Sequence, residues 1–102
     1  MSSEFLAAAE ASRKLLAKPT DDELLTLYAL FKQGKQDPPF DQAPAPGMFD
    51  FKGKYKHGKW KEIVDEGISP EQAQEKYVEL VEKLKAKYGY DESKVPEPIG
   101  AQ

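Results

Sequence analysis

The sequence contains no cysteine and no asparagine among its 102 residues. Without cysteine, neither a disulfide framework nor a thiolate metal site is available, so packing alone must stabilise the fold. Without asparagine, the chain has no acceptor for N-glycosylation. The one histidine, His57, has no cysteine or second histidine with which to form a metal site. We therefore expect a protein without a metal or other cofactor.

Long apolar runs are also missing. No stretch approaches the ~20 apolar residues that a membrane-spanning helix needs. The opening residues, MSSEFLAAAEASRK, do not place a basic region ahead of an apolar run, as a secretory signal does. The chain is 39% hydrophobic and 32% charged, which suits one small globular domain. We expect a cytoplasmic, single-domain protein.

Hydrophobic residues recur at intervals of three and four in four segments, which proline and glycine separate. The predicted helices cover about residues 3–18, 20–36 and 70–88, and a further one begins near residues 50–52 and ends at about 64. Pro19 is expected to end the first helix, because the residue before a proline is pushed out of helical geometry. There is no strand pattern and no internal repeat. The sequence predicts an all-α fold, a single-domain four-helix bundle.

Capping signals fix two of the predicted helix starts. Thr20 with Glu23, and Ser69 with Gln72, have the spacing at which side chains and backbone amides satisfy each other. Gly89 is expected to stop the last helix. The predicted organisation is a helical domain over residues 1–89 and a flexible tail over residues 90–102.

A proline-rich stretch separates the second and third predicted helices. Residues 37–47 read DPPFDQAPAPG and hold four of the eight prolines in the chain. Such a segment is an ordered or semi-rigid connector and not a helix. Its length lets it cross the end of the bundle, so the third helix need not run antiparallel to the second.

A cationic segment follows this connector. Residues 51–61 carry five lysines and no acid, so this segment is +5 in a chain of net charge −3, and the remainder sums to −8. Aromatic side chains alternate with these lysines. On the preceding helix, Tyr28 and Lys32 are four residues apart and share one face. A local cationic patch with aromatic rings suits a ligand that has a phosphate-like end and a flat or apolar end.

The cationic segment has features in common with other kinds of site. Residues 53–59 match the start of a phosphate-binding loop, G-x-x-x-x-G-K, but Trp60 replaces its serine or threonine and no strand precedes it. A nucleic acid would be repelled by the acidic remainder of the chain. Stable membrane insertion would need a strongly apolar helix face, which the pattern does not offer. A solvated helix face, or a site that docks an acidic protein segment, remains open.

Three motifs carry a further signal. PGMFDFKGKYKHGKW at residues 46–60 is preceded by L-x-x-Y-x-x-F-K-Q at 25–33 and followed by A-x-x-x-Y at 73–77. Together they closely resemble the acyl-CoA-binding protein family, over about residues 5–89. The resemblance implies a four-helix bundle with a long connector between helices two and three. It also implies a carrier, not an enzyme, which binds long-chain acyl-CoA esters one to one and serves their transport in fatty acid metabolism.

The resemblance further implies which residues bind the ligand. Those implied for the CoA portion are Arg13, Tyr28, Ala29, Leu30, Phe31, Lys32, Lys52, Lys56 and Tyr77, and those bordering the acyl groove are Ala9, Leu24 and Leu25. Phe31 stands where many members have tyrosine, and His57 replaces a common tryptophan. The implied partner is a fatty acyl-CoA ester, with no nucleic acid, no catalytic residue and a monomeric protein.

Overall fold

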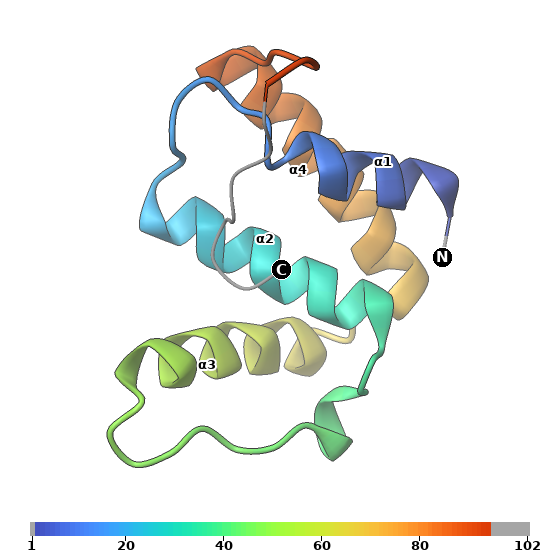
Figure 1. Ribbon diagram of the computed structural model, residues 1–102. Helices are drawn as coiled ribbons and strands as arrows, with labels where there is room; N and C mark the ends of the chain where they lie inside the picture. Colours follow the sequence, from blue (N-terminus) through green and yellow to red (C-terminus); the bar gives the residue numbers. More distant parts are fainter. Residues whose placement is uncertain (1, 95–102) are drawn as a thin grey trace.

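The structure, a computed structural model, describes residues 2–94. Within that range it contains four α-helices and one short 3-10 helix, shown in Figure 1: α1 (Ser3–Ala11), α2 (Asp21–Lys35), η1 (Phe40–Gln42), α3 (Phe51–Asp65) and α4 (Pro70–Tyr88). Over these residues the only β-type pairing is a single isolated bridge. The predicted all-α, four-helix fold is confirmed.

Reciprocal caps start α2 and α4, as predicted. The Thr20 hydroxyl accepts from the Glu23 amide at 3.2 Å, and the Glu23 carboxylate accepts from the Thr20 amide at 2.9 Å. Ser69 and Gln72 form the same pair at α4. Gly89, with a φ of 81°, ends α4 in a conformation that favours glycine. These boundaries follow from local chemistry, because each cap lies within four residues of the groups that it satisfies.

The prediction for the first helix is wrong at its C-terminal end. The helix stops at Ala11, well before Pro19, and the Ser12 hydroxyl donates to a carbonyl of its last turn at 2.8 Å. Further on, the backbone of Leu15 pairs with that of Tyr90 in the isolated antiparallel bridge. This pairing needs extended backbone, so a tertiary contact overrides the helical pattern of residues 12–18.

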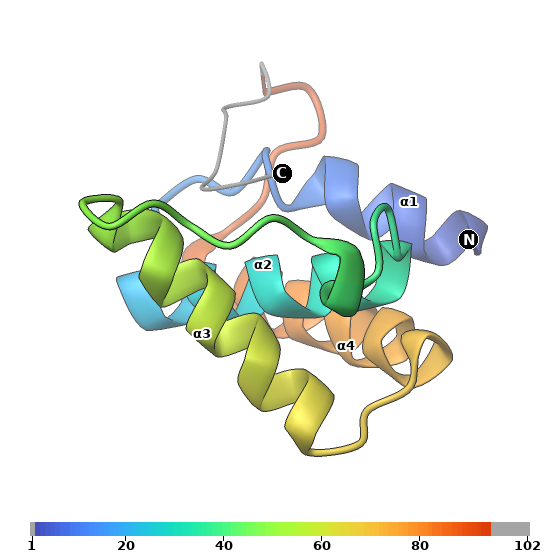
Figure 2. The same cartoon turned by 90° about the horizontal axis from the view of Figure 1, so that it is seen from below.

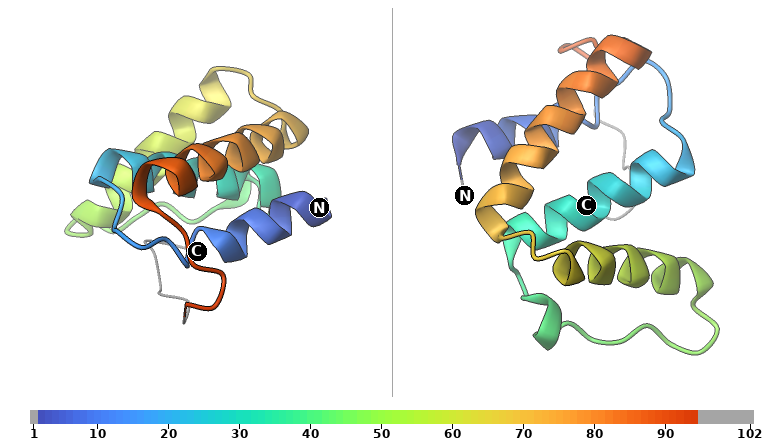
Figure 3. Two further views of the ribbon diagram at one scale, coloured as in Figure 1. Left: turned by 90° about the horizontal axis from the view of Figure 1, so that it is seen from above. Right: turned by 180° about the vertical axis from the view of Figure 1, so that it is seen from behind.

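Helix α2 lies at the centre of the four-helix arrangement. It contacts both α3 and α4, and α1 contacts α4. Figure 2 shows α3 beside α2, and the view from behind in Figure 3 shows α4 at an oblique angle to α2. In Figure 1, α2 and α3 both run from left to right, because the long connector returns the chain to the same end of the bundle before α3 begins. This parallel pair positions the candidate site.

Aromatic rings fill the core between α1, α2 and α4. Phe5 stacks on Phe31 with ring centroids 5.4 Å apart and meets the edge of Tyr77 at 5.2 Å. Phe5 and Tyr77 are completely buried. Aliphatic and small residues of all four helices complete the core: Ala8, Ala11, Leu27, Ala29, Leu30, Ile63, Ala73, Val81 and Leu84.

The chain continues past α4 along the segment that follows α1. Beyond the bridge at Tyr90, the Lys94 ammonium donates to the Leu15 carbonyl at 2.6 Å. The rest of the predicted tail, residues 95–102, lies outside the described residues. The proposed division of the chain at residue 89 therefore stays a prediction.

Candidate ligand-binding site

Helix α2 places Tyr28 and Lys32 one turn apart on the side that meets α3. Both side chains are half-buried. The Lys32 ammonium lies 5.9 Å from the centroid of the Tyr28 ring and 5.9 Å from that of Trp60, which α3 contributes. These distances are within the range of cation–π attraction, so the two aromatic rings favour an ammonium at this position.

Helix α3 adds a second ammonium to the same ring. The Lys56 ammonium lies 5.6 Å from the centroid of Tyr28. One phenol ring is therefore approached by two cations that come from different helices. We call Tyr28, Lys32 and Lys56 the Tyr28 cluster. An anion placed between the two ammonium groups would be attracted by both at once.

Burial shifts the pKa values of two residues in this cluster, Tyr28 and Lys56. It raises the pKa of the Tyr28 phenol, which therefore stays neutral near neutral pH. Burial also lowers the pKa of Lys56, the neighbouring charge of Lys52 lowers it further, and Asp50 opposes the shift. Because its ammonium is partly desolvated and repelled by a like charge, Lys56 is a cation that a bound anion would stabilise.

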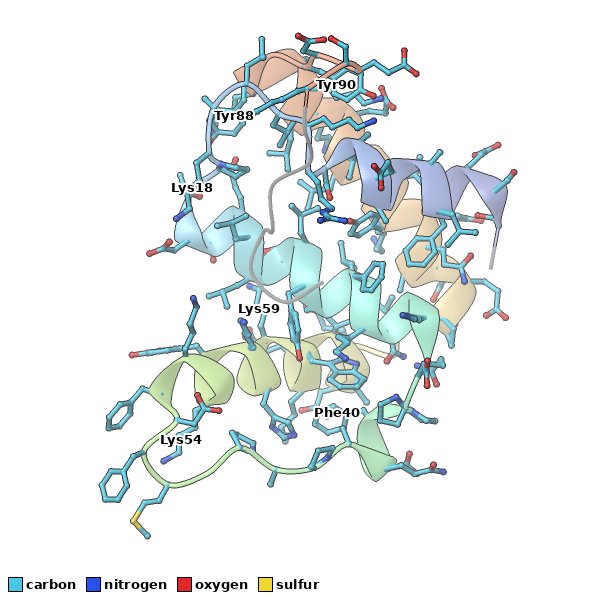
Figure 4. All side chains as sticks on the ribbon, in the orientation of Figure 1. Lys18, Phe40, Lys54, Lys59, Tyr88 and Tyr90 are labelled. Carbon is cyan, nitrogen blue, oxygen red and sulfur yellow. The ribbon has the colours of Figure 1, made fainter. Side chains whose placement is uncertain are left out.

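Three of the other four lysines of the cationic segment are engaged by oxygens of the chain itself: Lys54, Lys59 and Lys61. Lys61 pairs with Asp65 at 2.7 Å, and Lys59 lies 4.0 Å from the Asp22 carboxylate across the gap to α2. Figure 4 shows Lys59 projecting between these two helices. Lys56 instead faces the ring of Tyr28 on the neighbouring helix, whereas the ring near the Lys54 ammonium is Phe51 of its own helix.

Trp60 forms the buried floor beside the cluster. Its indole nitrogen donates to the Gln33 side-chain oxygen at 3.1 Å, and the Gln33 amide donates to the Ile68 carbonyl at 2.9 Å. Phe40 of η1 meets the edge of the Trp60 ring at 5.1 Å and lies 4.8 Å from the His57 ring. Sequence reasoning did not assign roles to Gln33 or Phe40. Gln33 belongs to the motif at residues 25–33, so that motif could have indicated a role for it.

Three residues of the predicted site are buried in the core. Ala29 and Tyr77 are 0% exposed and Leu30 is 4% exposed. The Tyr77 hydroxyl donates to the Ser12 hydroxyl at 3.2 Å, away from the Tyr28 cluster. In this conformation they support the wall of a site from within the core. Their contact with a ligand stays a prediction.

The remaining predicted residues lie on α1, on the stretch after it, on α2 and on α3. Lys52 is exposed on α3, one turn before Lys56, and Arg13 is half-buried directly after α1. Phe31 is half-buried on α2 against the aromatic core. The predicted groove residues are also half-buried: Ala9, Leu24 and Leu25. Their roles stay predictions.

Other kinds of site find little support over residues 2–94. Residues 53–59 lie wholly within α3, so they do not form the loop that cradles phosphates in nucleotide hydrolases. No group of three or more metal-ligating side chains gathers in this part of the chain. None of the helices described has the length and apolar character needed to cross a bilayer.

The fold and the Tyr28 cluster define a small helical protein with a cationic, aromatic site between two parallel helices. The family model for "Acyl CoA binding protein" matches residues 2–81. "Acyl-CoA-binding protein homolog 1" of Caenorhabditis elegans is 47% identical over 89 residues, covering 87% of this chain and 99% of the relative. "Acyl-CoA-binding protein" of Saccharomyces cerevisiae is 40% identical over 84 residues, covering 82% of this chain and 92% of the relative.

A solved structure agrees with these relatives. The crystal structure of Oryza sativa Acyl-CoA-Binding Protein 2 superposes with a TM-score of 0.70 at 33% identity, covering 82% of this chain and 89% of the other. The chain belongs to the acyl-CoA-binding protein family, and the resemblance found in the sequence is confirmed.

Proposed function

We propose that this protein binds long-chain acyl-CoA esters, one per chain, and serves as a cytoplasmic carrier that is monomeric and not an enzyme. The observation that carries the proposal is the Tyr28 cluster, in which α2 and α3 direct two ammonium groups to one aromatic ring. Two cations beside an aromatic surface match a phosphorylated nucleoside. Family membership supports the same ligand.

The head of the ligand would be held by charge and by ring contacts. Lys32 and Lys56 supply point charges for phosphate oxygens, and Tyr28 supplies a face for the adenine ring. Arg13 and Lys52 are proposed as further cationic contacts. Because Lys56 is partly desolvated in the free protein, its interaction with a phosphate would be less weakened by water than that of a fully exposed lysine.

The acyl chain would supply a large share of the affinity. Each buried methylene contributes about 0.8 kcal/mol before ordering costs are subtracted. The half-buried residues Ala9, Leu24 and Leu25 are proposed to border its groove. Removing the chain and its thioester from water would protect the ligand without a catalytic group. This explains how a carrier, needing no cofactor, could keep a deliverable pool.

Titration calorimetry tests the proposal. Palmitoyl-CoA should give saturable heat with one site per chain, octanoyl-CoA should bind more weakly, and free CoA more weakly still. Heat that is indifferent to chain length, or no heat, would favour the alternative in which the lysine-rich helix docks an acidic protein segment.

Alanine variants test the site itself. Lys56→Ala and Tyr28→Ala should each weaken palmitoyl-CoA binding by more than tenfold, about 1.4 kcal/mol. Helicity by circular dichroism should not change. Lys83→Ala is a matched control, because Lys83 is an exposed lysine on α4. Wild-type affinity in the Lys56 and Tyr28 variants would refute the assigned site.

A further inference from the structure

Large apolar side chains are exposed together where the connector meets α3. Four of them lie within eight residues: Met48 (74% exposed), Phe49 (82%), Phe51 (64%) and Tyr55 (71%). We call these four residues the apolar tip. The other large hydrophobic residues that the described chain exposes, Leu6 and Leu16, lie outside this segment. Such a concentration of exposed apolar surface usually marks an interaction site.

The backbone and lysines of this corner are held in place. The Asp50 carboxylate caps α3 by accepting from the Gly53 amide at 2.9 Å. The Lys54 ammonium donates to the Met48 carbonyl at 2.7 Å and lies 5.7 Å from the centroid of the Phe51 ring. In Figure 4, Lys54 lies at the outer corner of the molecule beside the start of α3. These contacts fix the backbone of the corner at which the apolar side chains are exposed.

Positive charge predominates around the tip. Lys52 and Lys54 are both exposed beside the apolar side chains, and Asp50, occupied as a helix cap, is the one acid between residues 47 and 61. The N-terminus of α3 adds the positive end of its dipole. The rest of the molecule is strongly acidic. An anionic surface would therefore attract this corner and repel the remainder.

We propose that the apolar tip docks the protein on the anionic surface of a lipid bilayer, with Met48 and Phe49 entering the interface and Lys52 and Lys54 meeting lipid headgroups. The contact is peripheral and reversible, because it uses a few side chains and no apolar helix face. The proposal goes beyond the binding of acyl-CoA and does not require it. Docking would bring the protein to a lipid surface, where an acyl-CoA ester, which is an amphipathic thioester, could be taken up or released.

A bilayer suits the tip better than an acidic protein segment does. The tip projects from the end of the bundle, as Figures 1 and 2 show for the segment entering α3. Aromatic and aliphatic side chains ringed by lysines are the pattern of interfacial membrane contacts. A leaflet rich in anionic lipid supplies the apolar and the negative components in one surface.

The absence of cysteine allows a direct test, since one introduced cysteine gives a single labelling site. Met48→Cys, at the tip, and Leu6→Cys, on α1, are each labelled with nitrobenzoxadiazole, whose emission rises in an apolar environment. The vesicles contain phosphatidylcholine with roughly 30% phosphatidylserine, and no acyl-CoA. Emission should rise at position 48 and stay constant at position 6. Phosphatidylcholine vesicles alone should give a much smaller rise.

Vesicle sedimentation with unlabelled variants provides the matched comparison. Phe49→Ala should lower the partition coefficient by about three- to tenfold through lost apolar contact, and Lys54→Gln by about fivefold through lost charge. Leu6→Ala and Lys83→Gln, which change exposed residues elsewhere, should match the wild type. Phe49 and Lys54 both lie outside the proposed ligand site, so calorimetry with palmitoyl-CoA tests that site separately.

Three outcomes would overturn the proposal. Equal emission changes at positions 48 and 6 would mean that the tip is not the contact. An unchanged signal at both positions would mean that the bilayer is not the partner. A rise at position 48 with a polyglutamate peptide but not with the vesicles would assign the tip to an acidic protein instead.

Discussion

Lys56 differs from Lys59 and Lys61 in what surrounds its ammonium group. Lys59 and Lys61 face carboxylates, whereas Lys56 faces the Tyr28 ring and feels the like charge of Lys52. A carboxylate partner would compete with an incoming phosphate. An aromatic ring does not, so the charge of Lys56 remains available to an anion.

The lowered pKa of Lys56 leads to a pH prediction. Phosphate binding needs the ammonium form, and this form is lost as the pH rises through a pKa below the ordinary value of 10.5. As the pH is raised, the affinity for palmitoyl-CoA should therefore begin to fall at a lower pH than it would if Lys56 had the ordinary lysine pKa. Lys56→Arg should remove this part of the fall, because a guanidinium stays charged throughout the range. Calorimetry at increasing pH measures both, and identical profiles for the two proteins would contradict the assignment.

Residue patterns predicted part of the Tyr28 cluster but not the hydrogen bond between Gln33 and Trp60 beside it. Tyr28 and Lys32 could be paired from the sequence, because i and i+4 positions share a helix face. Lys56 could be added through the motif that it occupies. The bond between Gln33 and Trp60 joins residues on different helices, and no local spacing encodes it. The burial of Tyr77 likewise depends on how α1, α2 and α4 meet around it.

At the scale of elements, Gln33 couples α2 to α3. Trp60 is 2% exposed, and its indole nitrogen has Gln33 as acceptor. Gln33→Ala should lower the free energy of unfolding by about 1–3 kcal/mol, because it leaves a buried donor without its partner. Urea unfolding followed by the fluorescence of the single tryptophan measures the change. Gln42→Ala, at an exposed position of η1, should have little effect, and equal stability of both variants would argue against this coupling.

Glu23 couples the start of α2 to the end of α4. Its carboxylate accepts from the Tyr88 hydroxyl, from the Thr20 amide and from the Lys87 ammonium, the last at 2.9 Å. The Tyr88 hydrogen bond, followed by those from Thr20 and Lys87, lowers the pKa of Glu23 from 4.5 to about 2. The carboxylate is therefore ionised more readily in the folded protein than in the unfolded chain.

This shift sets the sign of an acid-stability prediction. A lowered pKa contributes stability that is present above pH 4.5 and is lost as the pH falls towards 2. Glu23→Gln cannot titrate, so its free energy of unfolding should fall less steeply than that of the wild type across this range. Urea unfolding at several pH values tests this. Glu79→Gln, on an exposed part of α4, should keep the wild-type slope, and the same slope in the Glu23 variant would contradict the prediction.

Element boundaries were predictable where local chemistry sets them. The capping boxes at Thr20 and Ser69 and the stop at Gly89 act within a few residues. The end of α1 was not predictable, because the pairing of Leu15 with Tyr90 spans almost the whole chain. The end of α2 also lacks a glycine signal: Gln36 adopts a φ of 56° there, and its side chain donates to the Gln33 carbonyl at 2.8 Å.

At the scale of the whole molecule, the proposed site exists only when the bundle is assembled. Lys32 belongs to α2 and Lys56 to α3, and the proline-containing connector between these helices does not by itself hold them together. In the unfolded chain the two ammonium groups are not held beside the same aromatic ring. A ligand that contacts both should therefore bind the folded state and not the unfolded one.

This argument gives a prediction for thermal unfolding. Palmitoyl-CoA at 100 times its dissociation constant should stabilise the fold by about 2.7 kcal/mol, which raises the melting temperature by roughly 10 °C or more for a domain of this size. Free CoA at the same concentration should give a much smaller rise, because it lacks the apolar chain. Lys56→Ala should reduce the rise in melting temperature with palmitoyl-CoA, because a ligand that binds more weakly stabilises the folded state less. Equal rises for Lys56→Ala and the wild type would show that the ligand stabilises the bundle without using its α3 lysine.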